Sequence, residues 1–135
     1  MSLGSWRRRY YPVAAHRVPK GGRARAMLRK WRGLRAPALA RHGFYHGYRT
    51  PVVEGVGDAD EYFLVNNEHC SYCLKMEHCS ECPVCREGHG LDCDNRRSAY
   101  WRWLAKDDPE PMIGILTRLA RREAAAERRA RSRRG

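Results

Sequence analysis

The chain has 135 residues and a formal net charge of +12, from 27 Lys and Arg against 15 Asp and Glu. This length allows one domain at most. Because no run approaches the roughly 18 consecutive apolar residues of a transmembrane helix, a membrane-spanning protein is excluded and no membrane partner is expected.

The charge is distributed in three parts. Residues 1–53 hold 13 basic and no acidic residues, residues 54–95 hold two basic and ten acidic, and residues 96–135 hold 12 basic and five acidic. We therefore predict a basic arm with one amphipathic helix at 1–53, an acidic zinc-knuckle core at 54–105, and a C-terminal helix with a basic tail at 106–135. The expected fold class is small, zinc-stabilised and α, with mostly irregular knuckles, two to three helices and extended basic arms at both ends.

The first elements lie in the basic arm. Residues 1–21 are rich in Arg, Tyr, Pro and Gly, which predicts an extended segment. Residues 23–35 predict an amphipathic helix that ends before Pro37, because apolar residues recur at helical spacing. Its apolar face consists of Met27, Leu28, Trp31 and Leu34.

Aromatic and cationic side chains alternate over residues 41–51, and Arg far outnumbers Lys in both basic segments. Guanidinium groups bind phosphate in a bidentate manner, and aromatic rings stack on bases. This pattern predicts a nucleic-acid partner, with RNA or single strands favoured over duplex DNA, whereas solubility alone is the alternative explanation of the arginines. The candidate contacts are Arg7, Arg8, Arg9, Arg23, Arg25, Arg29, Lys30, Arg32, Arg35, Arg41, Tyr45, Tyr48 and Arg49.

A short strand is predicted at residues 62–65, and it leads into a segment that contains all six cysteines. Two residues between thiolates allow both sulfurs to reach one ion, which is why CxxC pairs recur in metal sites. We expect this metal to replace a hydrophobic core that the acidic segment is too poor in apolar residues to form. The candidate ligands are Cys70, Cys73, Cys79, Cys82, Cys85, Cys93, His78 and His89.

Zinc is the expected cofactor, as one or two ions, because four tetrahedral ligands complete each site. An iron–sulfur cluster is the alternative, since Cys79, Cys82 and Cys85 repeat the start of a bacterial ferredoxin run. However, His89 stands where the next cysteine of that run belongs. Three ligand sets remain open: Cys70, Cys73, Cys82 and Cys85; Cys70, Cys73, His78 and Cys82; or Cys82, Cys85, His89 and Cys93.

Disulfides are the other possible use of these cysteines, and two observations argue against them. The N-terminus runs straight into Arg7, Arg8 and Arg9 without the apolar segment of a signal peptide. The short loops between CxxC cysteines also gain little stability from crosslinking. The same arginine-rich, acid-free start is compatible with a transit peptide, so an organellar matrix is the alternative to the expected cytoplasmic location.

Two helices are predicted after the last cysteine. Residues 97–106 place Tyr100, Trp101, Trp103 and Leu104 on a broad apolar flank. Asp108, followed by Pro and Glu, has the composition of a helix start. Beyond Arg121 the apolar face disappears, which predicts a frayed tail over the last dozen residues. The apolar stripe of this second helix consists of Met112, Ile113, Ile115, Leu116, Leu119 and Ala120.

The cysteine order resembles that of small Cys-rich proteins encoded by tailed bacteriophages. The match covers about residues 62–120, and Cys85 is an addition to the pattern. The resemblance implies a zinc-binding accessory protein located in the cytoplasm of a host cell, and it supplies no reaction. The run that carries it is His69, Cys70, Cys73, Cys79, Cys82, Pro83, Cys93 and Tyr100, followed by the acidic-Pro helix start.

No catalytic motif accompanies the cysteines. HExxH, the deaminase pattern and a phosphate-binding glycine loop do not occur, so neither an enzyme nor a small-molecule substrate is expected. We therefore expect a non-catalytic zinc- and nucleic-acid-binding accessory protein. The alternatives are a structural subunit of a large ribonucleoprotein or virion, whose arms order on partner surfaces, and a protein-binding inhibitory factor whose acidic centre mimics nucleic acid.

Overall fold

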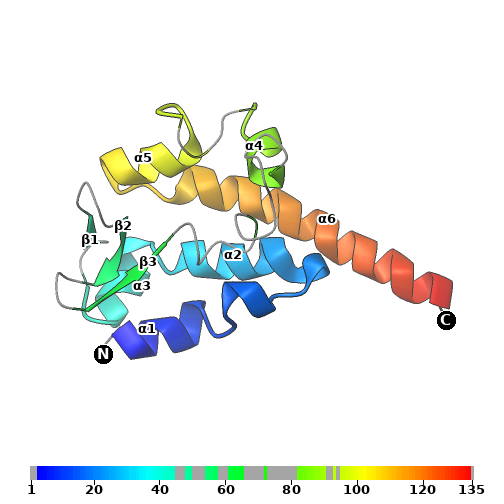
Figure 1. The fold of residues 1–135 in the computed structure, drawn as a ribbon, viewed down its shortest axis with the longest axis horizontal. Coiled ribbons are helices and arrows are strands. Elements are labelled where there is room, and N and C mark those ends of the chain that lie inside the picture. Colours follow the sequence, from blue (N-terminus) through cyan, green and yellow to red (C-terminus); the bar gives the residue numbers. More distant parts are fainter. Residues whose placement is uncertain are drawn as a thin grey trace.

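Helices dominate the computed structural model, so the predicted mainly helical fold class is confirmed in its coarse form. The longest helix, α6 (Glu110–Arg134), packs along α2 (Arg23–Arg32), and this pair forms the centre of the molecule (Figure 1). The structure describes residues 3–44, 48–49, 54–57, 61–65, 72, 82–90, 93 and 95–134.

The remaining elements surround this helix pair. Figure 1 shows α1 beneath α2, the sheet at one end, and α4 and α5 on the other side of α6. Within the described ranges no helix is both long enough and apolar enough to span a bilayer. The bounds are α1 (Leu3–Tyr10), the 3-10 turns η1 (Ala15–Arg17) and η2 (Lys20–Gly22), α3 (Ala36–Arg41), β1 (Tyr48–Arg49), β2 (Glu54–Gly57), β3 (Tyr62–Leu64), α4 (Pro83–Glu87) and α5 (Ala99–Lys106).

The three strands form one antiparallel sheet in the order β1-β2-β3, and β3 confirms the strand predicted there. Val56 pairs with Phe63, and both side chains are buried against the helices. Gly57 closes the turn to β3 with a φ of +121°, and a Cβ there would lie 2.8 Å from the Cα of Tyr62. Only glycine fits this turn without strain.

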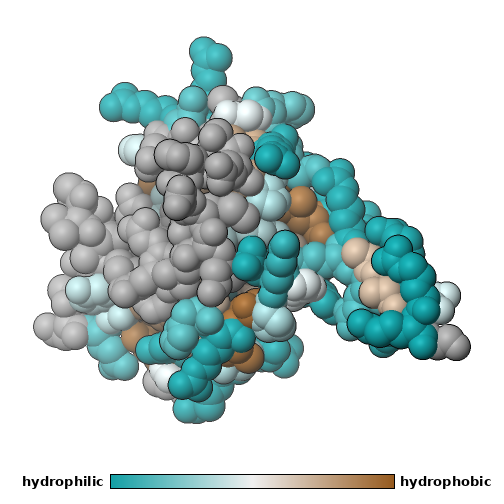
Figure 2. All heavy atoms as spheres, turned by 45° about the vertical axis from the view of Figure 1, so that its right-hand side comes forward, coloured by the Kyte–Doolittle hydropathy of each residue, from teal (hydrophilic) through white to brown (hydrophobic). Residues whose placement is uncertain are grey.

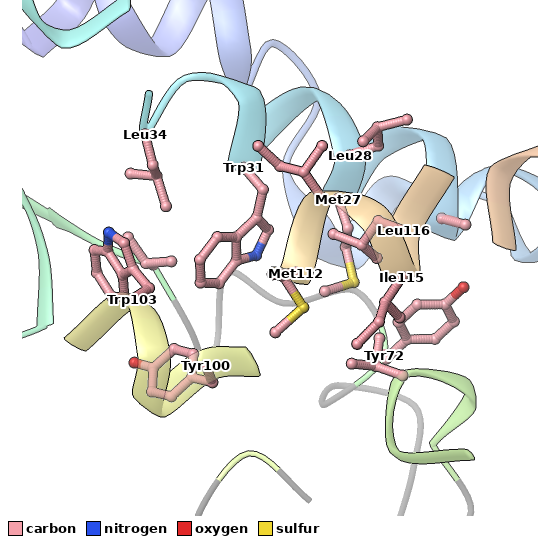
Figure 3. Packing of buried hydrophobic residues seen from close by; sticks show 14 of the residues in the cluster. Met27, Leu28, Trp31, Leu34, Tyr72, Tyr100, Trp103, Met112, Ile115 and Leu116 are labelled. Carbon is pink, nitrogen blue, oxygen red and sulfur yellow. The ribbon is translucent and has the colours of Figure 1, made fainter. Parts of the chain in front are cut away.

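The core is hydrophobic and aromatic. The whole predicted apolar face of α2 and the whole predicted stripe of α6 are buried. Trp31 packs edge-to-face on Trp103, with ring centroids 5.3 Å apart, and Tyr100 lies 6.0 Å from Trp31 (Figure 3). Such aromatic pairs stabilise a core beyond their buried area. The described residues of the acidic segment share this hydrophobic core with both basic segments, so the segment contributes more apolar side chains to a core than expected, whereas its stabilisation by zinc stays a prediction.

The predicted extended arm at residues 1–21 is wrong. α1 is helical because Leu3 and Trp6 form an apolar face three residues apart, which the many arginines concealed. Trp6 is fully buried, and its indole Nε1 donates a hydrogen bond of 2.8 Å to the carbonyl oxygen of Gly33. A Cβ on Gly33 would lie 2.5 Å from Cγ of Tyr10, so glycine permits this close approach.

Three further expectations require correction. The structure has six α-helices among its described residues, not two to three. α2 ends at Arg32, before the predicted end, and Pro37 lies in the first turn of the next helix, α3. α6 continues to Arg134 instead of fraying, because residues 121–134 are almost entirely strong helix formers.

Candidate metal centre and nucleic-acid interface

The second half of the cysteine segment forms α4 and the turn after it. Cys82 is the N-cap residue of α4, Pro83 occupies the first turn, and Cys85 is buried one turn further on. Residues three apart on a helix are neighbours, so the backbone places Cys82 and Cys85 on the same side of α4. This arrangement fits the prediction that the pair acts as one half of a metal site.

The chain reverses directly after α4. The amide of Gly88 donates to the carbonyl oxygen of Val84 at 3.0 Å, and the amide of Gly90 donates to that of Cys85 at 2.9 Å. His89 (φ 61°) and Gly90 (φ 78°) both adopt the left-handed conformation, which is uncommon for a residue with a side chain. The turn leaves the His89 side chain exposed at the protein surface, close in sequence to the buried Cys85.

α4 is attached to α6 by the ion pairs of Glu87 and by close packing. The carboxylate of Glu87 accepts from Nε of Arg118 at 3.1 Å and also from Nη1 of Arg122. These hydrogen bonds, first that of Arg122 and then that of Arg118, lower the pKa of Glu87 below its usual range. A Cβ on Gly88 would lie 3.5 Å from Cδ1 of Ile115, so this turn packs directly on α6.

Tyr72, which lies in sequence between Cys70 and Cys73, belongs to the same core. Tyr72 is buried and belongs to the main hydrophobic cluster. Figure 3 shows it on the Ile115 side of that cluster. Tyr72 and α4 therefore both contact the core that α6 helps to form.

The predicted ligand set is only partly within the described residues. Cys82, Cys85 and Cys93 are thiols and not disulfides. Cys70, Cys73, Cys79 and His78 lie outside those residues. Among the residues that are described, no group of three or more His, Cys, Asp or Glu side chains assembles into a potential metal site. The metal and its ligand partition therefore stay predictions.

Most of the predicted nucleic-acid contacts lie on the surface. Arg7, Arg8 and Arg9 occupy the last turn of α1 and are exposed. On α2, the exposed arginines at 25, 29 and 32 follow one face of the helix at spacings of four and three residues. Arg29 Nε donates to the carbonyl oxygen of Arg9 at 2.6 Å, which joins the two helices.

A groove of about 390 Å³ lies between α1 and α2. No acidic side chain lines it, so its walls have a positive potential that attracts anions. Within the described part of the chain, neither Arg9 nor Arg32 has a carboxylate within ion-pair distance. The lining residues are Arg9, Tyr10, Arg25, Leu28, Arg29 and Arg32.

Lys30 is not a surface contact, contrary to the prediction. It is 1% exposed, and its ammonium group donates a hydrogen bond to the carbonyl oxygen of Val65. The cause is its position on α2, where residue 30 falls on the same side as the buried Met27 and Leu34. Lys30 thus joins α2 to the end of the strand that leads into the cysteine segment.

Two other predicted arginines are held by carboxylates. Arg35 forms a two-pronged ion pair with Glu110, with Nε and Nη2 at 2.9 and 2.7 Å from the carboxylate oxygens. Hydrogen bonding to Glu110 raises the pKa of Arg35, and the same contact lowers the pKa of Glu110. Arg25 Nη2 lies 2.9 Å from Glu127, so the guanidinium groups of Arg25 and Arg35 already have protein partners.

The remaining predicted contacts divide by what the structure describes. Arg41 is exposed, and Arg23 is half-buried near the start of α2. The backbone of Tyr48 and Arg49 forms β1, and Tyr45 lies outside the described residues.

The C-terminal end of α6 is a structured cationic surface that was not predicted from the sequence. Beyond its contacts with the body, α6 extends past the end of α2 and away from the rest of the molecule (Figures 1 and 2). Residues 128–134 of this extension contain five exposed arginines and no acidic residue. Helix-forming residues over 121–131, with Glu127 and Arg131 four apart, were the signal that could have identified it.

Comparison with models of protein families, with curated proteins and with solved structures produced no match.

Proposed function

We propose that this protein is a non-catalytic metal-binding protein that binds nucleic acid through the phosphate backbone. The observation that carries the proposal is the projecting end of α6, where the exposed arginines follow one another without any acidic residue. A helix that stands clear of the body can approach a nucleic-acid strand without steric conflict. Guanidinium groups match phosphate geometry better than ammonium groups do, which suits the preference for Arg over Lys.

The size of the electrostatic effect follows from the number of arginines. Each neutralised phosphate of a single strand contributes about −0.7 to the slope of log K against log salt concentration. Five contacts from residues 128–134 would give a slope of about −3.5. The exposed arginines of α1 and α2 would make it steeper.

The cysteine segment supplies a structural metal site in this proposal. Cys82, Cys85 and Cys93, together with Cys70, Cys73 and Cys79 and with His78 or His89, would hold one or two zinc ions. A structural zinc ion crosslinks chain segments that have little regular structure, and it stabilises the folded state. The shared core with α6 means that removal of the metal should loosen the cysteine segment locally without unfolding the helix pair.

The alternative of a subunit threaded into a larger assembly depended on extended arms. Residues 3–44 instead pack on the core through Trp6 and the buried face of α2. A free binding protein therefore accounts better for the N-terminal segment.

The binding proposal is tested by fluorescence anisotropy with a labelled single-stranded oligonucleotide over a range of salt concentrations. The variant Arg128→Gln, Arg129→Gln, Arg131→Gln removes three charges from the projecting helix. The matched control Arg96→Gln, Arg97→Gln, Arg102→Gln removes three exposed charges elsewhere. We expect the first variant to flatten the salt slope by about 2 and the control to leave it nearly unchanged. Equal effects of the two variants would contradict the proposal.

The metal proposal is tested by native mass spectrometry before and after chelation. We expect one or two zinc ions in the untreated protein and a loss of mass that equals those ions after chelation. Circular dichroism should show that most helix content remains, because α2 and α6 pack through apolar side chains. A protein isolated in a reducing buffer without any bound metal would contradict this part of the proposal.

A further inference from the structure

A second hollow adjoins the arginine groove, and it is apolar. It lies between α2 and the turn that follows α1, and it has a volume of about 100 Å³. Two residues, Tyr10 and Arg29, line both hollows, so the groove and the pocket share a border. The pocket is lined by Tyr10, Tyr11, Pro12, Val13, Ala15, Val18, Ala26, Met27, Arg29 and Lys30.

The walls of this pocket are held in place by contacts with the core. The hydroxyl of Tyr11 accepts a hydrogen bond of 2.7 Å from the amide of Ala15, which braces the turn across the mouth. The Tyr11 ring packs on Phe63, with ring centroids 4.6 Å apart. Ala26 lines the pocket with a small side chain, so a larger residue at this position would occupy part of its volume. Val13, which also lines the pocket, is 49% exposed.

The two hollows together select a ligand of a particular shape. Four arginines favour an anion in the groove, whereas the pocket favours an apolar group. An enclosed apolar cavity of about 150 Å³ accommodates a whole benzene ring; this pocket of about 100 Å³ is smaller but open to solvent, so it admits part of one six-membered ring while the rest of the ring remains outside. A long acyl chain is too large for this space. A nucleotide with a pyrimidine base combines a phosphate and a ring of the required size.

We propose that the groove and the pocket form a site for one nucleotide of a single strand, with its phosphate in the groove and a pyrimidine base in the pocket. This inference rests on the proposed function and deepens it. Arg9, Arg29 and Arg32 bind the phosphate, while Arg25 remains paired with Glu127. Because the pocket lining is apolar, the ring faces contact the pocket while the polar edge of the base stays in water at its open side, so the site selects ring size and not base identity.

The test compares three labelled oligomers of equal length, namely oligothymidylate, oligodeoxyadenylate and an abasic deoxyribose-phosphate chain. The wild-type protein should bind oligothymidylate about tenfold more tightly than the abasic chain, since stacking of one base has an effect of this order. Oligodeoxyadenylate should bind with intermediate affinity, because a purine is too large for the pocket. Equal affinities for oligothymidylate and the abasic chain would overturn the inference.

Variants locate the effect. Ala26→Leu fills the pocket, and it should reduce the affinity for oligothymidylate to that for the abasic chain without changing the latter. Ala105→Leu is the matched control on the exposed side of α5. Val13→Asp places a charge at the exposed rim and provides a second route if Ala26→Leu does not fold. Arg32→Gln should weaken binding of all three oligomers, whereas its control Arg97→Gln should not. Wild-type behaviour of both pocket variants would also overturn the inference.

Competition experiments distinguish a nucleotide from other ligands of this site, and the α6 variant distinguishes this site from the projecting helix. Thymidine monophosphate should displace oligothymidylate more effectively than inorganic phosphate does, because only the nucleotide fills both hollows. More effective displacement by decanoate would point to a carboxylate lipid and overturn the inference. The arginine variant of α6 should keep the preference for thymidylate over the abasic chain. If the arginine variant of α6 flattened the salt slope but neither it nor the wild type preferred oligothymidylate over the abasic chain, the pocket would be refuted and the proposed function supported.

Discussion

Glu123, on α6, caps the N-terminus of α2, and its removal should destabilise the protein measurably. Gly22, the N-cap residue of α2, offers no side chain to the first free amides. The Glu123 carboxylate takes that role, and it accepts from the amide of Ala24 at 2.7 Å and from the amide of Arg25 at 3.2 Å. The two residues lie 99 and 98 positions away in sequence, so this cap forms only when α2 and α6 pack together.

The magnitude follows from the value of a cap and from the burial of this carboxylate. Loss of an N-cap acceptor costs about 0.5–2 kcal/mol. The Glu123 side chain is only 15% exposed, so solvent replaces its hydrogen bonds poorly and the upper half of that range applies. We expect Glu123→Ala to lower the free energy of unfolding by about 1–2 kcal/mol, which corresponds to a fall in Tm of roughly 3–8 °C.

Glu127→Ala is the matched control. Glu127 also pairs with Arg25, at 2.9 Å, but the two side chains are 42% and 47% exposed and no backbone amide is capped. Exposed pairs of this kind contribute about 0–1 kcal/mol. Urea denaturation followed by circular dichroism measures both variants. If Glu123→Ala were no more destabilising than Glu127→Ala, the capping argument would be refuted.

Two further predictions concern charged residues whose roles the structure assigns. Glu87 has a lowered pKa because Arg122 and Arg118 donate to it, so its contribution to stability is present above its usual pKa and is lost as the pH falls through its folded value. Between about pH 5 and pH 3 the Tm of the wild type should fall further than that of Glu87→Gln. If Tm fell equally with pH in the two proteins, a stabilising role of the Glu87 ion pairs would be contradicted. Lys30→Met should reduce the free energy of unfolding by about 1–3 kcal/mol, because the carbonyl of Val65 loses its buried donor. Urea denaturation measures this change, and a stability equal to that of the wild type would contradict the structural role of Lys30.

The sequence by itself determined the helices with a regular apolar pattern. The faces of α2 and α6 are buried as predicted, α5 begins two residues later than expected, and Asp108 accepts from the amide of Glu110 at 3.1 Å at the predicted start of α6. These features are local, because spacing along one helix decides which side chains share a face. The same local reasoning missed α1, whose short apolar face lies among arginines and becomes apparent only when Trp6 meets Gly33.

Only the tertiary structure decided which charged residues are available to a partner. Lys30, Arg25 and Arg35 lie among exposed arginines in the same basic segment. Lys30 is nevertheless buried, and Arg25 and Arg35 are paired with glutamates of α6. The environment of an ionisable side chain depends on what packs against its helix, and that neighbour is distant in sequence. For the same reason the groove and the apolar pocket beside it, which lie between separate elements, could not be predicted from the order of residues.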